Sequence, residues 1–487
     1  MHPRHLLAFA SIFACAAVLV VAGCSSAPKS SGQKKKRTVL LTEHDDARVG
    51  REASRDVKAE IGIIEDAGLN AYVGRIGRKL LRGVPRRSFQ YQFSVVDQLE
   101  PNAFALPGGY IFISRGLLAL ANNEDELACV IGHEITHAAL RHAARQQALA
   151  GRESSLAMPW VRAANIASYG RDMEREADKG GQMLAAAAGY DPMGMSTFLK
   201  NMGQNERLIV GHSRLPTFYD THPGSTERAS TNAIRARELR WTRDPALGDT
   251  RASLLREIDG LALGPRPQGG VFQGDRFLHP DLDFQVRFPN GWRTSNTNRA
   301  VGAVSPRGDA VVFVTADQPA GDPQAVAEAF VEKTQQEQSV DVKESQPVKI
   351  GRIDAWRMRL EGGGGGRSVA AYVTFVPYRG STWRIMGVSP ARAAEQYLGR
   401  TLSTARSFRP LTPEEKNSLT VTRLRLATAR PDEDLRALGR RTGNAWDPSH
   451  AAVYNGIFVN HRFGGGERVK IASVTPYVPG SPQPKAP

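Results

Sequence analysis

The sequence predicts a multidomain protein in which a mainly α-helical domain with a small sheet is followed by an α+β domain and a small third module. Before residue 260, apolar residues recur with helical spacing in several segments. Between residues 280 and 410, short β-rich runs alternate with two helical segments. The Pro/Gly-rich stretch GPRPQGG lies between the two regions and predicts a linker.

The N-terminal segment indicates export. Residues 1–23 combine a basic start with an apolar run that ends in VAGC. This ending resembles a bacterial lipobox, in which Cys24 becomes the lipidated first residue of the mature protein, and Ser25 resembles a signal for outer-membrane sorting. An uncleaved membrane anchor is the alternative. We expect a bacterial protein that is lipid-anchored at the periplasmic face of the outer membrane.

The signal segment, the linker and the changes in composition divide the chain into six expected units. They are a lipoprotein signal peptide (1–23), a flexible basic tether (24–50), the helical domain (51–262), the α+β domain (275–410), the third module (411–477) and a disordered tail (478–487).

Net charge limits the kinds of molecule that the protein is expected to bind, and the cysteine count decides whether a disulfide is expected. The formal charge of +15 favours anionic surfaces. Nucleic acid is excluded for an exported lipoprotein, which leaves membrane headgroups or cell-wall polymers. Of three cysteines, Cys15 lies in the signal segment and Cys24 is the lipidation site, so no intrachain disulfide is expected. Cys129 is expected to be a small buried residue.

The stretch NNEDELACVIGHEITHAAL predicts a metal-binding helix. Asn123 and Glu126 have the spacing of a capping box. His133 and His137 are about 40° apart around a helix axis, so their rings share one face and can bind one tetrahedral zinc ion. Glu134 lies about 100° from His133 and can act as a general base. A surface helix with two solvated histidines is the alternative, but the neighbours are strongly apolar.

A catalytic zinc site normally has three protein ligands. In SYGRDMEREADKGGQML, Glu174 and Asp178 are four residues apart on a predicted helix, so the two carboxylates share a face. Glu174 can ligate the metal, and Asp178 can hydrogen-bond a ligand histidine. Spacing alone leaves a solvated charged helix as the alternative.

The order HEITH followed by RDMEREAD resembles the gluzincin metallopeptidases, which include the CAAX-prenyl proteases, the HtpX-type quality-control proteases and the periplasmic BepA-type proteases. The resemblance covers roughly residues 50–260 and implies a zincin fold with one Zn²⁺ per chain. The roles that it implies are zinc ligands for His133, His137 and Glu174, the general base for Glu134 and a hydrogen-bond partner of a ligand for Asp178.

The resemblance implies two further site elements. The run PGGYIFIS predicts a strand after a turn, and in the family a strand from this region pairs with the substrate backbone. Asn102, Ala103 and Phe104 are therefore substrate-binding candidates, although a hairpin that packs under the zinc helix is the alternative. His222, in the segment THP, corresponds to a histidine that can approach the zinc. It is a candidate regulatory ligand or catalytic donor.

The C-terminal half carries no predicted catalytic group. GGGGG at 362–366 predicts a hairpin loop, because no phosphate-binding lysine and hydroxyl follow it. Residues 411–477, with an extended segment, one helix and a final strand, loosely resemble a LysM-type cell-wall-binding module, which makes peptidoglycan a candidate partner. We find no 34-residue helical repeat of the kind that BepA-type proteins carry.

Together these features predict a zinc-dependent endopeptidase that acts on misfolded or stalled envelope proteins in quality control, because a strand-pairing cleft recognises unfolded backbone. The alternative is a largely latent metal-site protein that acts as an outer-membrane assembly or scaffolding factor. A cell-wall amidase is disfavoured by the order of the motifs.

Overall fold

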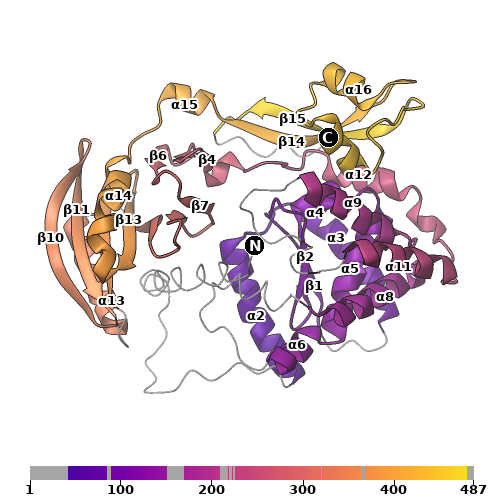
Figure 1. The fold of residues 1–487 in the computed structure, drawn as a ribbon, viewed down its shortest axis with the longest axis horizontal. Coiled ribbons are helices and arrows are strands. Elements are labelled where there is room, and N and C mark those ends of the chain that lie inside the picture. The colour runs from indigo at the N-terminus through magenta and orange to yellow at the C-terminus, as the bar shows by residue number, and fades with distance from the viewer. Residues whose placement is uncertain are drawn as a thin grey trace.

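The computed structural model describes residues 42–84, 89–150, 169–208, 218, 222, 225–319, 321–363 and 368–479. The predicted signal peptide, Cys24 and nearly all of the predicted disordered tail lie outside these residues. Figure 1 shows a helical domain, a sheet domain on the other side of the molecule and a small C-terminal module above the helical domain. Within the described residues, no helix combines the length and apolar character needed to span a membrane.

The helical domain contains most of the described helices. They are α2 (Glu43–Glu60), α3 (Ala67–Leu80), α4 (Arg115–Leu120), α5 (Glu124–Ala139), α6 (His142–Ala150), α8 (Arg171–Ala187), α9 (Gly194–Leu208), α11 (Ser225–Glu238) and α12 (Thr250–Ile258).

Helix starts follow local capping. Helix α2 begins at Glu43, inside the predicted tether, because Thr42 and Asp45 form a reciprocal capping box. Asn123 caps α5 as predicted, and its side chain accepts a hydrogen bond from the backbone N of Glu126. The reciprocal bond of a capping box would join the Glu126 carboxylate to the backbone N of Asn123. Instead, this carboxylate accepts a hydrogen bond from the backbone N of Asn122.

A three-stranded sheet lies beside α5 in the order β1-β3-β2, with β1 (Gln92–Val96), β2 (Ala103–Leu106) and β3 (Tyr110–Ser114). Strands β2 and β3 are antiparallel. The turn between them has positive φ angles at Gly108 and Gly109, which favour glycine. The predicted strand after the Pro-Gly-Gly turn is confirmed, and β2 forms one edge of the sheet.

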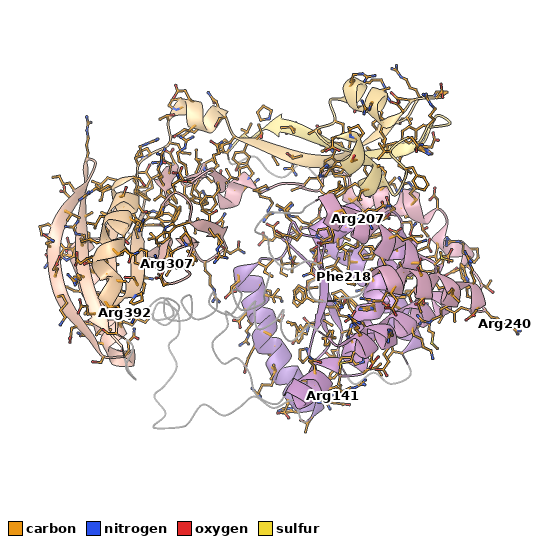
Figure 2. All side chains as sticks on the ribbon, in the orientation of Figure 1. Arg141, Arg207, Phe218, Arg240, Arg307 and Arg392 are labelled. Atoms are coloured by element: carbon orange, nitrogen blue, oxygen red, sulfur yellow. The ribbon has the colours of Figure 1, made fainter. Side chains whose placement is uncertain are left out.

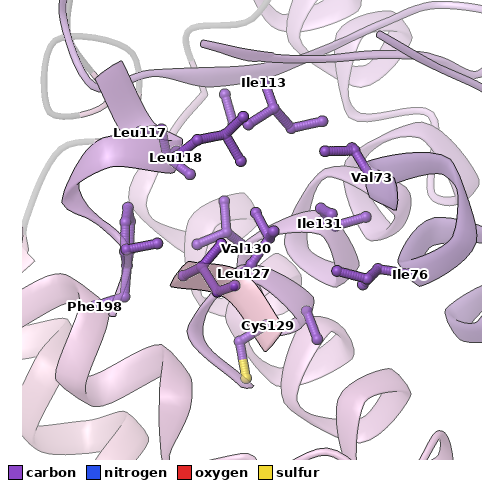
Figure 3. Packing of buried hydrophobic residues seen from close by; sticks show 14 of the residues in the cluster. Val73, Ile76, Ile113, Leu117, Leu118, Leu127, Cys129, Val130, Ile131 and Phe198 are labelled. Carbon is purple, nitrogen blue, oxygen red and sulfur yellow. The ribbon is translucent and has the colours of Figure 1, made fainter. Parts of the chain in front are cut away.

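Helix α5 passes through the main hydrophobic core. Leu127, Val130 and Ile131 are fully buried on one side of the helix, and Cys129 is buried as predicted. Burial of such apolar side chains is the main source of stability for this helix. The residues that pack around them come from α3, β3, α4 and α9 (Figure 3) and are Val73, Ile76, Ile113, Leu117, Leu118 and Phe198.

The sheet domain is α+β, as predicted. Its large sheet has the order β10-β11-β12-β13-β9-β8-β7, and neighbouring strands are antiparallel. Phe330 of α13 packs with the odd-numbered Val373, whereas Ala394 of α14 packs with the even-numbered Tyr372. The two helices therefore cover opposite faces, because side chains alternate along a strand. Its elements are β4 (Val271–Gln273), β5 (Arg276–His279), β6 (Phe284–Arg287), β7 (Arg293–Asn296), β8 (Val301–Val304), β9 (Val311–Pro319), α13 (Pro323–Glu337), β10 (Val340–Ile350), β11 (Ile353–Gly362), β12 (Val369–Tyr378), β13 (Ser381–Pro390), α14 (Ala394–Arg406) and α15 (Pro413–Asn417).

The C-terminal module, residues 420–476, has two helices between two antiparallel strands: β14 (Thr420–Thr428), α16 (Leu435–Thr442), α17 (Pro448–Asn455) and β15 (Arg468–Pro476). The sequence predicted one helix here. Helix α17 is short, and its apolar side chains Ala451, Ala452 and Val453 are too few to show a period. Val453 and Leu424 belong to the core of the helical domain, so the module packs against that domain.

Candidate metal centre

Two helices supply the predicted metal ligands. Helix α5 carries His133 and His137, and α8 carries Glu174. The helices approach closely where two glycines meet, since a Cβ atom on Gly132 would lie 2.9 Å from the carbonyl oxygen of Gly181. This close approach brings the carboxylate of one helix to the imidazoles of the other.

The candidate ligand atoms converge. The Nε2 atoms of His133 and His137 are 2.9 Å apart, and Glu174 oxygens lie 3.6 and 3.5 Å from them. His222 Nδ1 is 3.2 Å from His133 Nε2 and 3.0 Å from both Glu174 oxygens. Zinc–ligand bonds of about 2.0–2.1 Å place the corners of a tetrahedron about 3.3 Å apart. The four side chains therefore fit one tetrahedral zinc ion.

Glu134 is buried beside this cluster. Among the described residues, neither of its carboxylate oxygens accepts a hydrogen bond, and Oε1 lies 3.5 Å from His222 Nε2. A buried carboxylate without a hydrogen bond is costly and is typical of sites where a ligand or metal belongs. This orphaned side chain and the nitrogen-rich donor set both fit a catalytic zinc site.

Burial and charge set the protonation of the cluster. Burial raises the pKa of Glu134 and lowers the pKa of His137 far below its usual value. Burial opposes ionisation of Glu174, but the neighbouring His222 and His137 hold the pKa of this carboxyl well below its usual range. Burial also acts to lower the pKa of His222, but the carboxylates of Glu174 and Glu134 outweigh it and raise that pKa. The two shifts favour an ionised Glu174 beside a neutral His137.

The first candidate ligand, His133, is held by a charged network. His133 Nδ1 lies 3.0 Å from Asp178 Oδ1. Arg228 on α11 donates to both Asp178 oxygens, at 2.8 and 2.6 Å, and Asn232 donates to Oδ2 at 2.8 Å. Arg228 also lies 2.9 Å from Glu174 Oε2. The predicted role of Asp178 therefore fits the geometry, and α11 supplies the positive charge that compensates both buried carboxylates.

The second candidate ligand, His137, has other partners. His137 Nδ1 is 2.7 Å from the Nδ1 atom of His142, the first residue of α6. The Tyr169 ring stacks on the His137 ring with centroids 4.0 Å apart.

Comparison with known proteins agrees with this geometry. Residues 67–237 match the sequence model of a family described as Peptidase family M48. This region is an M48 peptidase domain. The family match and the donor set both support a zinc metallopeptidase site in this region.

Several curated relatives of the M48 domain are named as proteases. The beta-barrel assembly-enhancing protease of Yersinia pestis is 29% identical over 213 residues, which cover 38% of this chain and 43% of that protein. The protein of the same name in Escherichia coli K12 is 27% identical over 212 residues, covering 38% of this chain and 42% of that protein. The mitochondrial metalloendopeptidase OMA1 of Bos taurus is 35% identical over 159 residues, covering 28% and 30%. The chain spans less than half the length of each of these relatives.

In the M48 domain, His222 and Phe218 lie together at the metal cluster. The Phe218 ring, labelled in Figure 2, stacks on the His222 ring with centroids 4.3 Å apart. The backbone N of His222 donates to the carbonyl of Phe218, and the backbone N of Phe218 donates to the carbonyl of Pro101 at 3.0 Å. Pro101 lies just before β2, so Phe218 contacts the edge strand while His222 reaches the ligand cluster.

The three substrate-binding candidates lie at this edge strand and are buried. Both backbone groups of Asn102 form hydrogen bonds with Ser114, the last residue of β3. Its amide N donates to Ser114 Oγ, and its carbonyl accepts from Ser114 N. Because backbone groups alternate in direction along a strand, those of Ala103 point to the free side, and those of Phe104 point back to β3.

Several supporting residues of the M48 domain had no predicted role. Arg228 and Asn232 have the four-residue spacing of one helix face, and His142 follows the HEITH motif closely. These signals are visible in the sequence, but they do not say which side chain each residue meets. That information depends on how α6, α8 and α11 dock against α5.

Proposed function

We propose that the chain is a zinc-dependent endopeptidase that uses His133, His137 and Glu174 as zinc ligands and Glu134 as the general base. The observation that carries this proposal is the orphaned, fully buried carboxylate of Glu134 beside three converging protein ligands. A site of this composition has one position left for chemistry.

Bound zinc supplies Lewis-acid chemistry toward a scissile carbonyl. Glu134 takes the proton of the attacking water and delivers it to the leaving amine. The raised pKa of Glu134, caused by burial, suits this role because the carboxylate can hold the proton between the two transfers. Asp178 and Arg228 keep His133 and Glu174 oriented during these transfers.

An extended substrate segment can bind along the free edge of β2. Strand addition to an edge uses main-chain hydrogen bonds and demands little sequence specificity. Ala103 offers its backbone groups to this side, whereas Asn102 uses its own for Ser114. Among the three candidates, we assign substrate pairing to Ala103 and a supporting role to Asn102 and Phe104.

His222 keeps the enzyme inactive at rest. Its Nδ1 atom takes the fourth position around the metal cluster, and Phe218 pairs with Pro101 at the edge where a substrate would start. Displacement of Phe218 and His222 by substrate would free both the strand edge and the fourth position.

Substrates are misfolded or stalled envelope proteins, and the location is the periplasmic face of the outer membrane with Cys24 as the lipid anchor. Support comes from the lipobox-like VAGC and from relatives named as beta-barrel assembly-enhancing proteases. The C-terminal module, with its strand–helix–helix–strand order, is proposed to bind peptidoglycan in the manner of a LysM-type module.

A second candidate function is a mostly latent metal-site protein that acts in outer-membrane assembly or as a scaffold. The same contact of His222 with the ligand cluster favours it, because a permanently occupied fourth position would prevent hydrolysis.

Metal content and casein proteolysis, measured on the purified chain, test these functions. We compare the wild type with His222→Ala. One zinc per chain and proteolysis that rises in His222→Ala support the self-blocked enzyme. Zinc without proteolysis in either protein favours the latent function, and absence of bound metal contradicts the site.

A further inference from the structure

The two ligand histidines are supported in different ways. His133 faces the carboxylate of Asp178, which is a common partner for a metal-binding imidazole. His137 faces a second imidazole, because its Nδ1 atom lies 2.7 Å from His142 Nδ1. His142 Nε2 in turn lies 3.2 Å from Glu176 Oε2. A path of three side chains therefore leads from the metal cluster to a half-exposed carboxylate.

Only one arrangement of protons satisfies this path when His137 binds a metal through Nε2. The Nδ1 atom of His137 must then carry the proton and donate it to His142 Nδ1. His142 must accept at Nδ1 and donate from Nε2, and Glu176 Oε2 accepts that bond. Each donor meets an acceptor, so Glu176 fixes the tautomer of His142 and His142 fixes the tautomer of His137.

The backbone places His142 for this contact. Helix α5 ends at Ala139, and Arg141 has a φ of 52°, a left-handed conformation that is uncommon for arginine. This turn brings the first residue of α6 back under the preceding helix. Arg141 lies at the lower end of the helical domain in Figure 2 and is held there by two hydrogen bonds to Asp46 of α2.

The surroundings of His142 show that it is placed for hydrogen bonding as well as packing. The side chain is completely buried, and both ring nitrogens have partners within 3.2 Å. Glu176 also accepts a hydrogen bond from Arg145 Nη1 at 2.7 Å, which keeps the carboxylate ionised and oriented. Tyr169 covers the face of the His137 ring, so stacking restrains its tilt while His142 restrains its rotation.

We propose that His142, oriented by Glu176, is the positioning residue for the zinc ligand His137. It fixes the tautomer and the ring orientation of His137 and thereby raises the affinity of the site for zinc. This inference rests on the proposed zinc site, but it does not require that the site cleaves peptides.

Zinc affinity of the full chain, measured by chelator competition, tests the proposal with a pair of variants of nearly equal shape. His142→Asn keeps an oxygen acceptor close to the position of Nδ1, whereas His142→Leu has no acceptor. We expect His142→Leu to weaken zinc binding by about 10- to 100-fold, the usual effect of removing such a partner. His142→Asn should recover most of the affinity. Equal affinities in both variants overturn the proposal, whether they match the wild type or are equally weak.

A third variant avoids any change in the core. Glu176 is half-exposed, so Glu176→Leu, which has no acceptor for His142 Nε2, is expected to fold normally and to weaken zinc binding several-fold by loosening the tautomer of His142. In the cobalt-loaded protein, the visible absorption bands should shift in His142→Leu and return toward the wild type in His142→Asn. Unchanged affinity in Glu176→Leu and unchanged bands in His142→Leu contradict the proposal.

A matched control is His450→Asn, which alters a histidine–carboxylate pair in the C-terminal module and should leave zinc affinity unchanged. The outcomes also separate this inference from the proposed function. A wild type that binds zinc with the expected variant order but does not cleave casein supports the positioning role and contradicts the protease. A wild type that binds no zinc overturns both.

Discussion

At the residue scale, Glu134 separates metal binding from catalysis. Its oxygens accept no hydrogen bond from the described residues, so the isosteric Glu134→Gln breaks no such contact. We expect zinc content to stay at one ion per chain and casein cleavage to fall by about 10²- to 10⁴-fold, the usual contribution of a general base. The comparison is made in a His222→Ala background, where the fourth position is free. Cleavage that persists in the double variant would assign the base to another residue.

The candidate ligands could be picked out from the sequence because helical spacing determines which side chains share a face, and the family resemblance then linked the two helices. His133 and His137 are one turn apart, and Glu174 and Asp178 repeat that spacing. The partners of these residues could not be predicted in the same way. Arg228 reaches Asp178 across 50 residues of sequence, and no periodicity within one helix describes how two helices dock.

At the element scale, the docking of α5 on α8 depends on the absence of side chains. A Cβ atom on Gly181 would lie 2.7 Å from the backbone N of His133 and 2.9 Å from the carbonyl oxygen of Cys129. Both are backbone atoms of α5, so they cannot move aside without shifting the helix. The position of Glu174 relative to the histidines therefore depends on this glycine, which lies two turns further along α8 on the same face as Glu174.

Gly181→Ala should push the two helices apart. We expect a loss of roughly 1–3 kcal/mol in the free energy of unfolding, typical of overpacking. Zinc affinity should fall by about tenfold, comparable to the loss of a ligand's supporting partner. Chemical denaturation and chelator competition measure the two effects.

Gly399→Ala in α14 is the matched control, because a Cβ atom there meets nothing within 4 Å. It should stabilise the protein by up to about 1 kcal/mol. A Gly181→Ala protein with wild-type stability and affinity would contradict this account.

At the scale of the whole molecule, the C-terminal module is part of the helical domain's core. Leu424 and Val453 belong to that core, and β14 exchanges backbone hydrogen bonds with Gly260 and Leu261. The sequence predicted a separate module at 411–477 with an extended segment at its start and a strand at its end. The contact between this module and the helical domain could not be predicted from the sequence, because Lys470 meets the end of α4 across about 350 residues of chain.

Lys470 is completely buried at this junction, and its Nζ donates to the carbonyl oxygens of Ala119 and Ala121 at 2.8 Å each. These carbonyls lie at the C-terminal end of α4, where the last carbonyl groups of a helix have no hydrogen-bond donor within the helix. Lys470→Met keeps the length of the side chain but leaves both carbonyls without this donor. Since each buried unsatisfied group costs about 1–3 kcal/mol, we expect the unfolding free energy to drop by at least about 2 kcal/mol. Calorimetry should then show a lower midpoint for one transition shared by the helical domain and the module.

Lys349→Met, which removes an exposed ion pair in the sheet domain, should change stability by less than about 1 kcal/mol. If Lys470→Met instead separates the shared transition into two without lowering the first, the module is an independent unit that merely rests on the helical domain.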